Sequence, residues 1–214
     1  MNKLLKLAKT KIGCGYVFGA QGEIASSALL VILKKRFGIK YYEFMSKGKL
    51  VKAEKWLGKQ VFDCSGLIVW ALQQLGLLKP NQDYTAASLY NSLCKPIKLS
   101  ELQLGDLLFI ENASGHIDHM GIYAGAMKTV EAIGTDKGVV FGDSARFNLY
   151  GRLKFDLEEK LSWREIIQEH SASEENSADW QKAIVEVVKL ADEKKVPGIL
   201  KFLPLLLENI NNRV

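Results

Sequence analysis

The spacing of hydrophobic residues changes near residue 100, and this change restricts the fold more than any other feature. Before that point hydrophobic residues recur every three or four positions, the period of an α-helix, most clearly at Leu67, Ile68, Ala71, Leu72 and Leu75. After it, short runs alternate as β-strands do. We expect strands at residues 106–110, 119–123, 127–133, 138–141 and 151–155. Helices followed by antiparallel strands predict an α+β fold.

Several helical stretches are expected before the strands. A short helix over residues 2–12 ends at Gly13, and one or two helices lie within residues 23–60. The next helix begins at or just after Asp63-Cys64-Ser65, and a short one follows around residues 86–93. We therefore expect N-terminal helices packed on a central antiparallel β-sheet.

The chain of 214 residues is long enough for one main core and an appendage. We expect a main domain over residues 1–165, a polar linker over residues 166–177 and a helical tail over residues 178–214. The tail has an apolar face at Leu200, Leu203, Leu206 and Leu207. Because such a face is too apolar to leave in water, we expect the C-terminal helices to dock on the main domain or to self-associate.

The composition, with 48% hydrophobic and 25% charged residues, is typical of a folded globular protein. The net charge of +5 suits a polyanionic partner, but the basic residues are scattered, and no basic run has interleaved aromatics. We therefore expect a solvated basic face and no nucleic-acid binding. No apolar run approaches the ~20 residues of a membrane span. Lys6 interrupts the first apolar stretch, so we expect a protein that has no signal peptide and is made in the cytoplasm.

Cys64 is the candidate nucleophile among the three cysteines. No two of them have the C-x-x-C spacing of a metal site, and an odd number leaves at least one thiol free. A free cysteine is more often an inert buried side chain. Cys64 differs because it is expected at a helix N-terminus, where unpaired N–H groups and the helix dipole favour the reactive thiolate. We expect Asp63 to cap this helix.

His119 and Glu131 are the candidate base and its orienting partner. They are twelve residues apart, so a hairpin centred on Gly125, with residues 124–126 as its turn, would place them directly opposite each other. The carboxylate could then hold one ring nitrogen of His119 while the other faces the thiolate. Either residue alone could also be structural, as a strand histidine or as a glutamate paired with a lysine.

A zinc site at His116-Ile117-Asp118-His119 is the alternative interpretation of this histidine. In a strand, however, residues three apart point to opposite faces, and no second His or Cys cluster completes four ligands. We therefore expect no metal and no organic cofactor.

Four segments resemble motifs of the NlpC-type cell-wall peptidases, a family of papain-like cysteine peptidases. Phe62-Asp63-Cys64-Ser65-Gly66-Leu67-Ile68 resembles their nucleophile motif, and His119-Met120-Gly121-Ile122-Tyr123-Ala124-Gly125 resembles their histidine motif. Leu104-Gly105-Asp106-Leu107-Leu108-Phe109 is similar to the family's strand after a Pro-Gly-Asp turn. Gly15-Tyr16-Val17-Phe18-Gly19 resembles its Tyr-Val-Trp-Gly segment, with Phe18 in place of Trp. The resemblance covers about residues 3–155.

The resemblance implies a papain-like α+β fold and hydrolysis of amide bonds in peptidoglycan stem peptides, commonly between D-glutamate and the following diamino acid. It implies that Cys64 is the nucleophile and His119 the base. It also implies that Tyr16 lies near the oxyanion and the substrate, and that Asp63 and Ser65 receive the free amino end of the peptide.

Three departures from the family pattern bear on these expectations. Glu131 stands where the family usually has a histidine, and a carboxylate should orient His119 at least as well. Roughly 40 residues separate the tyrosine segment from the cysteine motif, a length that usually marks a functional insertion. We expect this helical insertion, about residues 20–60, to wall part of the substrate groove. The region after about residue 160 matches no part of the family pattern.

Other functions fit the same residues. The fold could carry an N-acetylmuramoyl-L-alanine amidase or an acyl transferase that works through the same thioester. A catalytically silent wall-binding or phage-structural module is the alternative from another class. A wall-directed activity without an export signal favours a phage or prophage product, such as a lysin.

Overall fold

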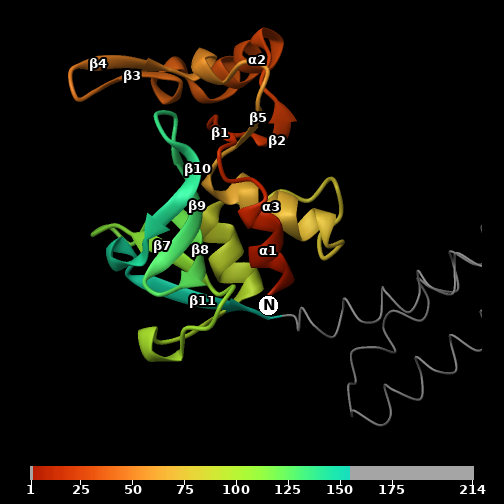
Figure 1. The fold of residues 1–214 in the computed structure, drawn as a ribbon, viewed down its shortest axis with the longest axis vertical. Coiled ribbons are helices and arrows are strands. Elements are labelled where there is room, and N and C mark those ends of the chain that lie inside the picture. Colours follow the sequence, from red (N-terminus) through yellow and green to blue (C-terminus); the bar gives the residue numbers. More distant parts are fainter. Residues whose placement is uncertain (1, 155–214) are drawn as a thin grey trace, which may run out of the picture. The chain divides into compact units, whose positions relative to one another are not determined.

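A computed structural model describes residues 2–154 of the chain (Figure 1). The predicted linker and tail lie outside these residues, so they and the self-association expected of the tail stay predictions. The α-helices are α1 Lys3–Lys9, α2 Ser27–Phe37, α3 Cys64–Gln74 and α4 Ala86–Ser88. The strands are β1 Gly15–Tyr16, β2 Gln21–Ile24, β3 Glu43–Ser46, β4 Lys49–Lys52, β5 Gln60–Phe62, β6 Cys94–Pro96, β7 Leu107–Glu111, β8 Ile117–Gly125, β9 Lys128–Gly134, β10 Gly138–Asp143 and β11 Leu149–Leu153.

A six-stranded antiparallel sheet forms the centre of the described residues, with the strand order β10-β9-β8-β7-β11-β6. Each of the five predicted strands overlaps one of its strands. The prediction of N-terminal helices followed by an antiparallel sheet is therefore confirmed as a mixed α and β fold.

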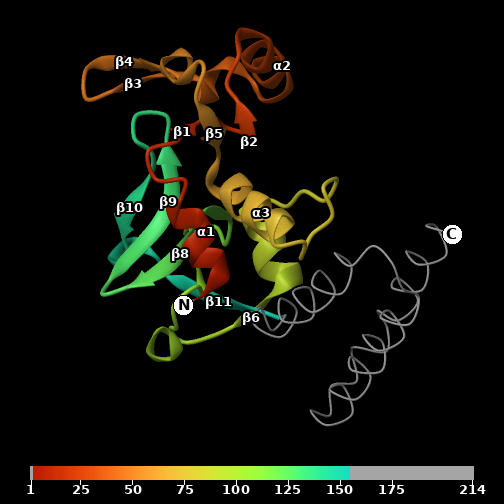
Figure 2. The ribbon, with the colours of Figure 1, turned by 45° about the vertical axis from the view of Figure 1, so that its right-hand side comes forward.

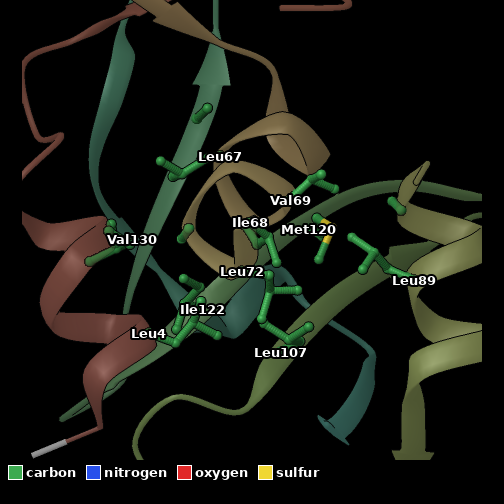
Figure 3. Packing of buried hydrophobic residues seen from close by; sticks show 14 of the residues in the cluster. Leu4, Leu67, Ile68, Val69, Leu72, Leu89, Leu107, Met120, Ile122 and Val130 are labelled. Atoms are coloured by element: carbon green, nitrogen blue, oxygen red, sulfur yellow. The ribbon is translucent and has the colours of Figure 1, made fainter. Parts of the chain in front are cut away.

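Helices α1 and α3 cover one face of this sheet (Figures 1 and 2). The alternation along β8 turns Met120 and Ile122 toward these helices, and both side chains are completely buried. Figure 3 shows the apolar layer between the helices and the sheet, in which the labelled side chains are Leu4, Leu67, Ile68, Val69, Leu72, Leu89, Leu107, Met120, Ile122 and Val130. This layer fixes the start of α3 against β8, where the candidate site lies.

The segment before α3 contains more strand than the sequence predicted. Helix α2 is present, but β3 and β4 form a hairpin where we expected a second helix or none, and β1, β5 and β2 form a small sheet of their own. The hairpin turns at Lys47 and Gly48, which both have positive φ angles of 47° and 74°. Two consecutive residues with positive φ make the tight turn that matches strand twist. The insertion therefore contains an expected helix together with strands that the sequence analysis did not predict.

The hairpin of β8 and β9 turns one residue later than the sequence predicted. Ile122 pairs with Val130 and Tyr123 with Thr129, and a bulge at Gly125 precedes a turn at Ala126 and Met127. Both turn residues have positive φ angles, of 48° and 58°. Continuing this register places Glu131 opposite Gly121, two residues beyond the predicted partner His119. The predicted register is therefore wrong, although the side chains of residues 119 and 131 still share one face.

Candidate active site

Cys64 is the first residue of α3, and Asp63 caps that helix as predicted. The Oδ1 atom of Asp63 accepts hydrogen bonds from the Gly66 N–H at 2.6 Å and from the Ser65 hydroxyl at 3.1 Å. Its Oδ2 atom accepts from the Gly19 N–H at 2.8 Å. The cap therefore ties the helix start to the residues 15–19 that carry Tyr16.

Gly66 allows the backbone at Ala20 to lie directly against the first turn of α3. A Cβ atom at residue 66 would lie 2.1 Å from the carbonyl oxygen of Ala20, so any larger residue would push the two segments apart. The same carbonyl accepts a hydrogen bond from the Asp63 N–H at 2.8 Å. The close approach of Ala20 to the first turn of α3 therefore requires glycine at residue 66.

The Cys64 thiol does not have the lowered pKa that its position at a helix end alone would give. Burial of the sulfur, followed by the negative charge of Asp63, raises the pKa of Cys64 to about 12. Backbone N–H groups, including that of Met120, lower this pKa but do not compensate. The helix end favours the thiolate, but the loss of hydration on burial disfavours it more strongly here. The Met120 N–H belongs to β8, so the sulfur lies beside this strand.

His119 and Glu131 are in direct contact. The His119 Nε2 atom lies 2.6 Å from the Glu131 Oε2 atom. The glutamate side chain is completely buried, whereas that of His119 keeps 14% of its surface exposed. Since a carboxylate can only accept, Nε2 carries a proton, and Nδ1 has no hydrogen-bond partner among the described residues. The ring therefore has one nitrogen held by the protein and one available for chemistry.

Two further features hold the Glu131 carboxylate in place. Its Oε1 atom accepts a hydrogen bond of 2.6 Å from the Thr129 hydroxyl. On the neighbouring strand β10, a Cβ atom at Gly142 would lie 1.7 Å from Oε1, so only glycine leaves room for the carboxylate. Gly121, opposite Glu131 on β8, also lies close to this side chain, although less closely than Gly142. A Cβ atom at Gly121 would lie 3.1 Å from the Glu131 Cβ atom.

Arg146 belongs to this group of side chains and was not predicted from the sequence. Its guanidinium donates to the Glu131 Oε2 atom, and its Nη2 atom lies 3.3 Å from the His119 Nε2 atom. The residue lies in the 3₁₀ turn Ser144–Arg146 after β10, and its side chain is 41% exposed. Phe147, next in the chain, is buried, and its ring centroid lies 5.9 Å from that of His119. No local sequence pattern marks a single arginine in a turn as a partner of Glu131.

Tyr16 lies in β1, which pairs with β5 directly before the Cys64 helix. Burial, together with the nearby negative charge of Asp63, raises the pKa of Tyr16 well above its usual value. The phenol therefore stays neutral and keeps its hydroxyl proton for donation. These interactions bring the predicted residues Tyr16, Asp63, Cys64 and Ser65 together at the start of α3.

The alternative zinc interpretation finds no support in the side-chain arrangement. His116 pairs with Asp118 at 3.2 Å, and both side chains are largely exposed, whereas His119 turns inward to Glu131. Within residues 2–154, no three His, Cys, Asp or Glu side chains gather in a way that could hold a metal ion. In the same part of the chain, no helix is long and apolar enough to span a bilayer.

Several known proteins resemble parts of the chain. A probable endopeptidase of Mycobacterium tuberculosis is 45% identical over 65 residues, which are 30% of this chain and 15% of that protein. The probable endopeptidase p60 of Listeria seeligeri is 38% identical over 94 residues, 43% of this chain and 17% of that protein. The chain thus spans less than a fifth of either relative. The solved structure of the peptidoglycan hydrolase RipB from Mycobacterium tuberculosis superposes with a TM-score of 0.46 and 20% identity, covering 72% of this chain and 64% of that one.

The NlpC/P60 family matches residues 52–188. This range begins later than the resemblance carried by the motifs, and it extends past residue 160, where the motifs provided no match. Both the Cys64 and the His119 motifs lie inside it. Because the match covers more than half of the 214 residues, the chain belongs to the NlpC/P60 family.

Proposed function

We propose that this protein is a cysteine-type peptidoglycan endopeptidase, with Cys64 as nucleophile, His119 as base and Glu131 as the residue that orients the base. The observation that carries the proposal is the contact between His119 and the buried Glu131, because His119 lies on β8, which packs against the helix that begins at Cys64. Its relatives from Mycobacterium tuberculosis and Listeria seeligeri, named as probable endopeptidases, support the same reaction.

The arrangement of helix and sheet supports a papain-like site. The nucleophile begins a helix that packs on an antiparallel sheet, and the base comes from β8, the third strand of that sheet to follow the helix along the chain. In such a site, the two reacting side chains come from elements that one apolar layer holds together. That layer holds α3, which begins at Cys64, against β8, which carries His119.

The first chemical step moves the Cys64 proton to His119. Because the thiol pKa is about 12, the proton leaves as the sulfur attacks the scissile carbonyl, not before the substrate binds. The free Nδ1 atom of His119 receives it, and the Glu131 carboxylate stabilises the resulting imidazolium through Nε2. A thioester to Cys64 forms, and His119 then protonates the leaving amine. Water hydrolyses the thioester and regenerates the thiol.

The neutral Tyr16 hydroxyl and the backbone N–H of Cys64 are suited to stabilise the oxyanion. Asp63 and Ser65 are suited to receive the free amino end of a stem peptide. The Asp63 oxygens already accept three hydrogen bonds, so a substrate amine would be a fourth donor to a carboxylate with about four lone-pair sites. The proposed scissile bond joins D-glutamate to a diamino acid.

Mass analysis of digested muropeptides tests this proposal and separates it from its rivals. The endopeptidase should release fragments with a new amino end on the diamino acid. Cleavage between the sugar and L-alanine would instead show an amidase, and products joined to an added amine would show an acyl transferase. No product from any muropeptide would favour a silent wall-binding module, which retains the fold without the reaction.

A further inference from the structure

The net positive charge of the chain is concentrated in residues 24–57. This segment contains eight Lys and Arg residues and two Glu residues, an excess of six. The complete chain has an excess of only five, so the remaining residues together carry one net negative charge. None of the residues given a role in the proposed hydrolysis lies in this segment.

Both acidic side chains of the segment are neutralised internally. The Lys34 ammonium lies 2.8 Å from a carboxylate oxygen of Glu43 and 2.6 Å from one of Glu54. Five exposed cations have no acidic partner among the described residues, namely Lys35, Arg36, Lys40, Lys47 and Lys49. Their charge is therefore available to an external anion.

Exposed apolar side chains gather in the same segment. Eight of the thirteen large hydrophobic side chains exposed among the described residues lie between Ile24 and Leu57. Met45 and Leu50 are direct cross-strand partners in the β3–β4 hairpin and are 66% and 57% exposed. Val31 and Ile32 on α2 are 65% and 63% exposed. Exposure of this kind on a soluble protein marks an interaction site.

These exposed side chains are not the ones that hold the segment together. A separate core lies beneath them and includes Leu30, Leu33, Tyr42 and Trp56. The Trp56 indole N–H also donates to the carbonyl of Thr135, at 2.7 Å, in the connection between β9 and β10. Figures 1 and 2 show the β3–β4 hairpin extending away from the large sheet. Its exposed pair can therefore be replaced without emptying a core.

We propose that the 24–57 segment docks on an anionic lipid bilayer. The unpaired cations would meet the headgroups, while Met45 and Leu50 enter the boundary between headgroups and acyl chains. A hydrophilic polyanion would use the cations alone and gain nothing from exposed Met and Leu. The combination of unpaired cations with exposed apolar side chains fits a charged bilayer better than a dissolved polymer.

Flotation of the full chain with lipid vesicles tests this docking. The chain should bind vesicles of phosphatidylcholine with 30% phosphatidylglycerol and show little binding to pure phosphatidylcholine. Replacing Lys47→Gln and Lys49→Gln together should weaken binding about 25-fold, since each cation near such a surface contributes about fivefold. Met45→Ser with Leu50→Ser should weaken it at least about tenfold.

Matched variants outside the segment serve as controls. Lys79→Gln with Lys95→Gln removes the same charge, and Leu99→Ser with Met127→Ser removes similar exposed apolar surface. Both should bind vesicles as the unchanged chain does, and all variants should keep the same circular dichroism and melting temperature. Equal binding to both vesicle types would overturn the proposal. So would full binding by the Met45 and Leu50 variant, which indicates charge alone, or its conversion of a dimer to a monomer, which indicates a second copy as the partner.

Discussion

The His119 ring is bound to Glu131 through Nε2, at 2.6 Å, and the carboxylate that holds it is completely buried. A buried carboxylate requires compensation, and here it has three donors: His119, Thr129 and Arg146. The orientation of the base therefore depends on residues from β8, β9 and the turn after β10.

Glu131→Gln should lower kcat by about 10²- to 10⁴-fold with little change in the fold. The Gln amide can donate to His119 Nε2, which would favour the tautomer with the proton on Nδ1, where the Cys64 proton must go. Steady-state kinetics on a defined muropeptide measures the effect. A variant with the kcat of the unchanged protein would mean that Glu131 does not orient the base.

Gly142→Ala should reduce activity nearly as much, although residue 142 touches no substrate. The new Cβ would lie 1.7 Å from Glu131 Oε1 and must displace the carboxylate, at a cost of about 1–3 kcal/mol in stability. Gly134→Ala on the same hairpin is the control, because its Cβ would meet only Asp136 at 3.5 Å. Equal activity of the two variants would show that the space beside Oε1 is unimportant.

Arg146→Gln should lower kcat/KM, because the Glu131 carboxylate would lose one of its three donors and would hold His119 less firmly. Arg146→Lys keeps the charge and should restore most of the activity. If Arg146→Gln lowered stability but left kcat/KM unchanged, the residue would have only a structural role.

Alkylation of Cys64 by iodoacetamide, without substrate, should be slow at pH 7 and should accelerate about tenfold per pH unit up to pH 10. The sign follows from the pKa of about 12, because the reactive thiolate is scarce below it and grows as the pH rises toward it. Peptide mapping separates Cys64 from Cys14 and Cys94. A fast rate that stays constant from pH 6 to 9 would instead require a preformed thiolate.

Local features of the site could be predicted from the sequence, whereas features that depend on packing could not. The Asp63 cap depends on residues no more than three positions away, so the local sequence is enough to predict it. The contact of His119 with Glu131 was predicted in a register that is wrong by two residues. The contact still forms, because an even shift keeps both side chains on the same face. The turn at Ala126 and Met127 lacks the usual glycine or asparagine, which directed the prediction to Gly125.

Arg146 and the raised pKa of Cys64 are consequences of tertiary structure. Arg146 reaches Glu131 only because β10 pairs with β9 and Gly142 leaves space between them. The thiol pKa depends on how completely the first turn of α3 is desolvated, and a helix pattern carries no information about that. The β3–β4 hairpin was missed because Met45 and Leu50 are apolar although they are exposed, so apolar residues stand on both faces of the hairpin and the sequence does not alternate.

Hydrolysis of purified peptidoglycan by three single-cysteine variants tests the central claim most directly. Cys64→Ala should release no soluble peptide above background while it keeps the melting temperature of the unchanged protein. Cys14→Ala and Cys94→Ala should both retain turnover, since neither sulfur lies at the start of α3. Release of the same peptides by Cys64→Ala at an undiminished rate would contradict the account.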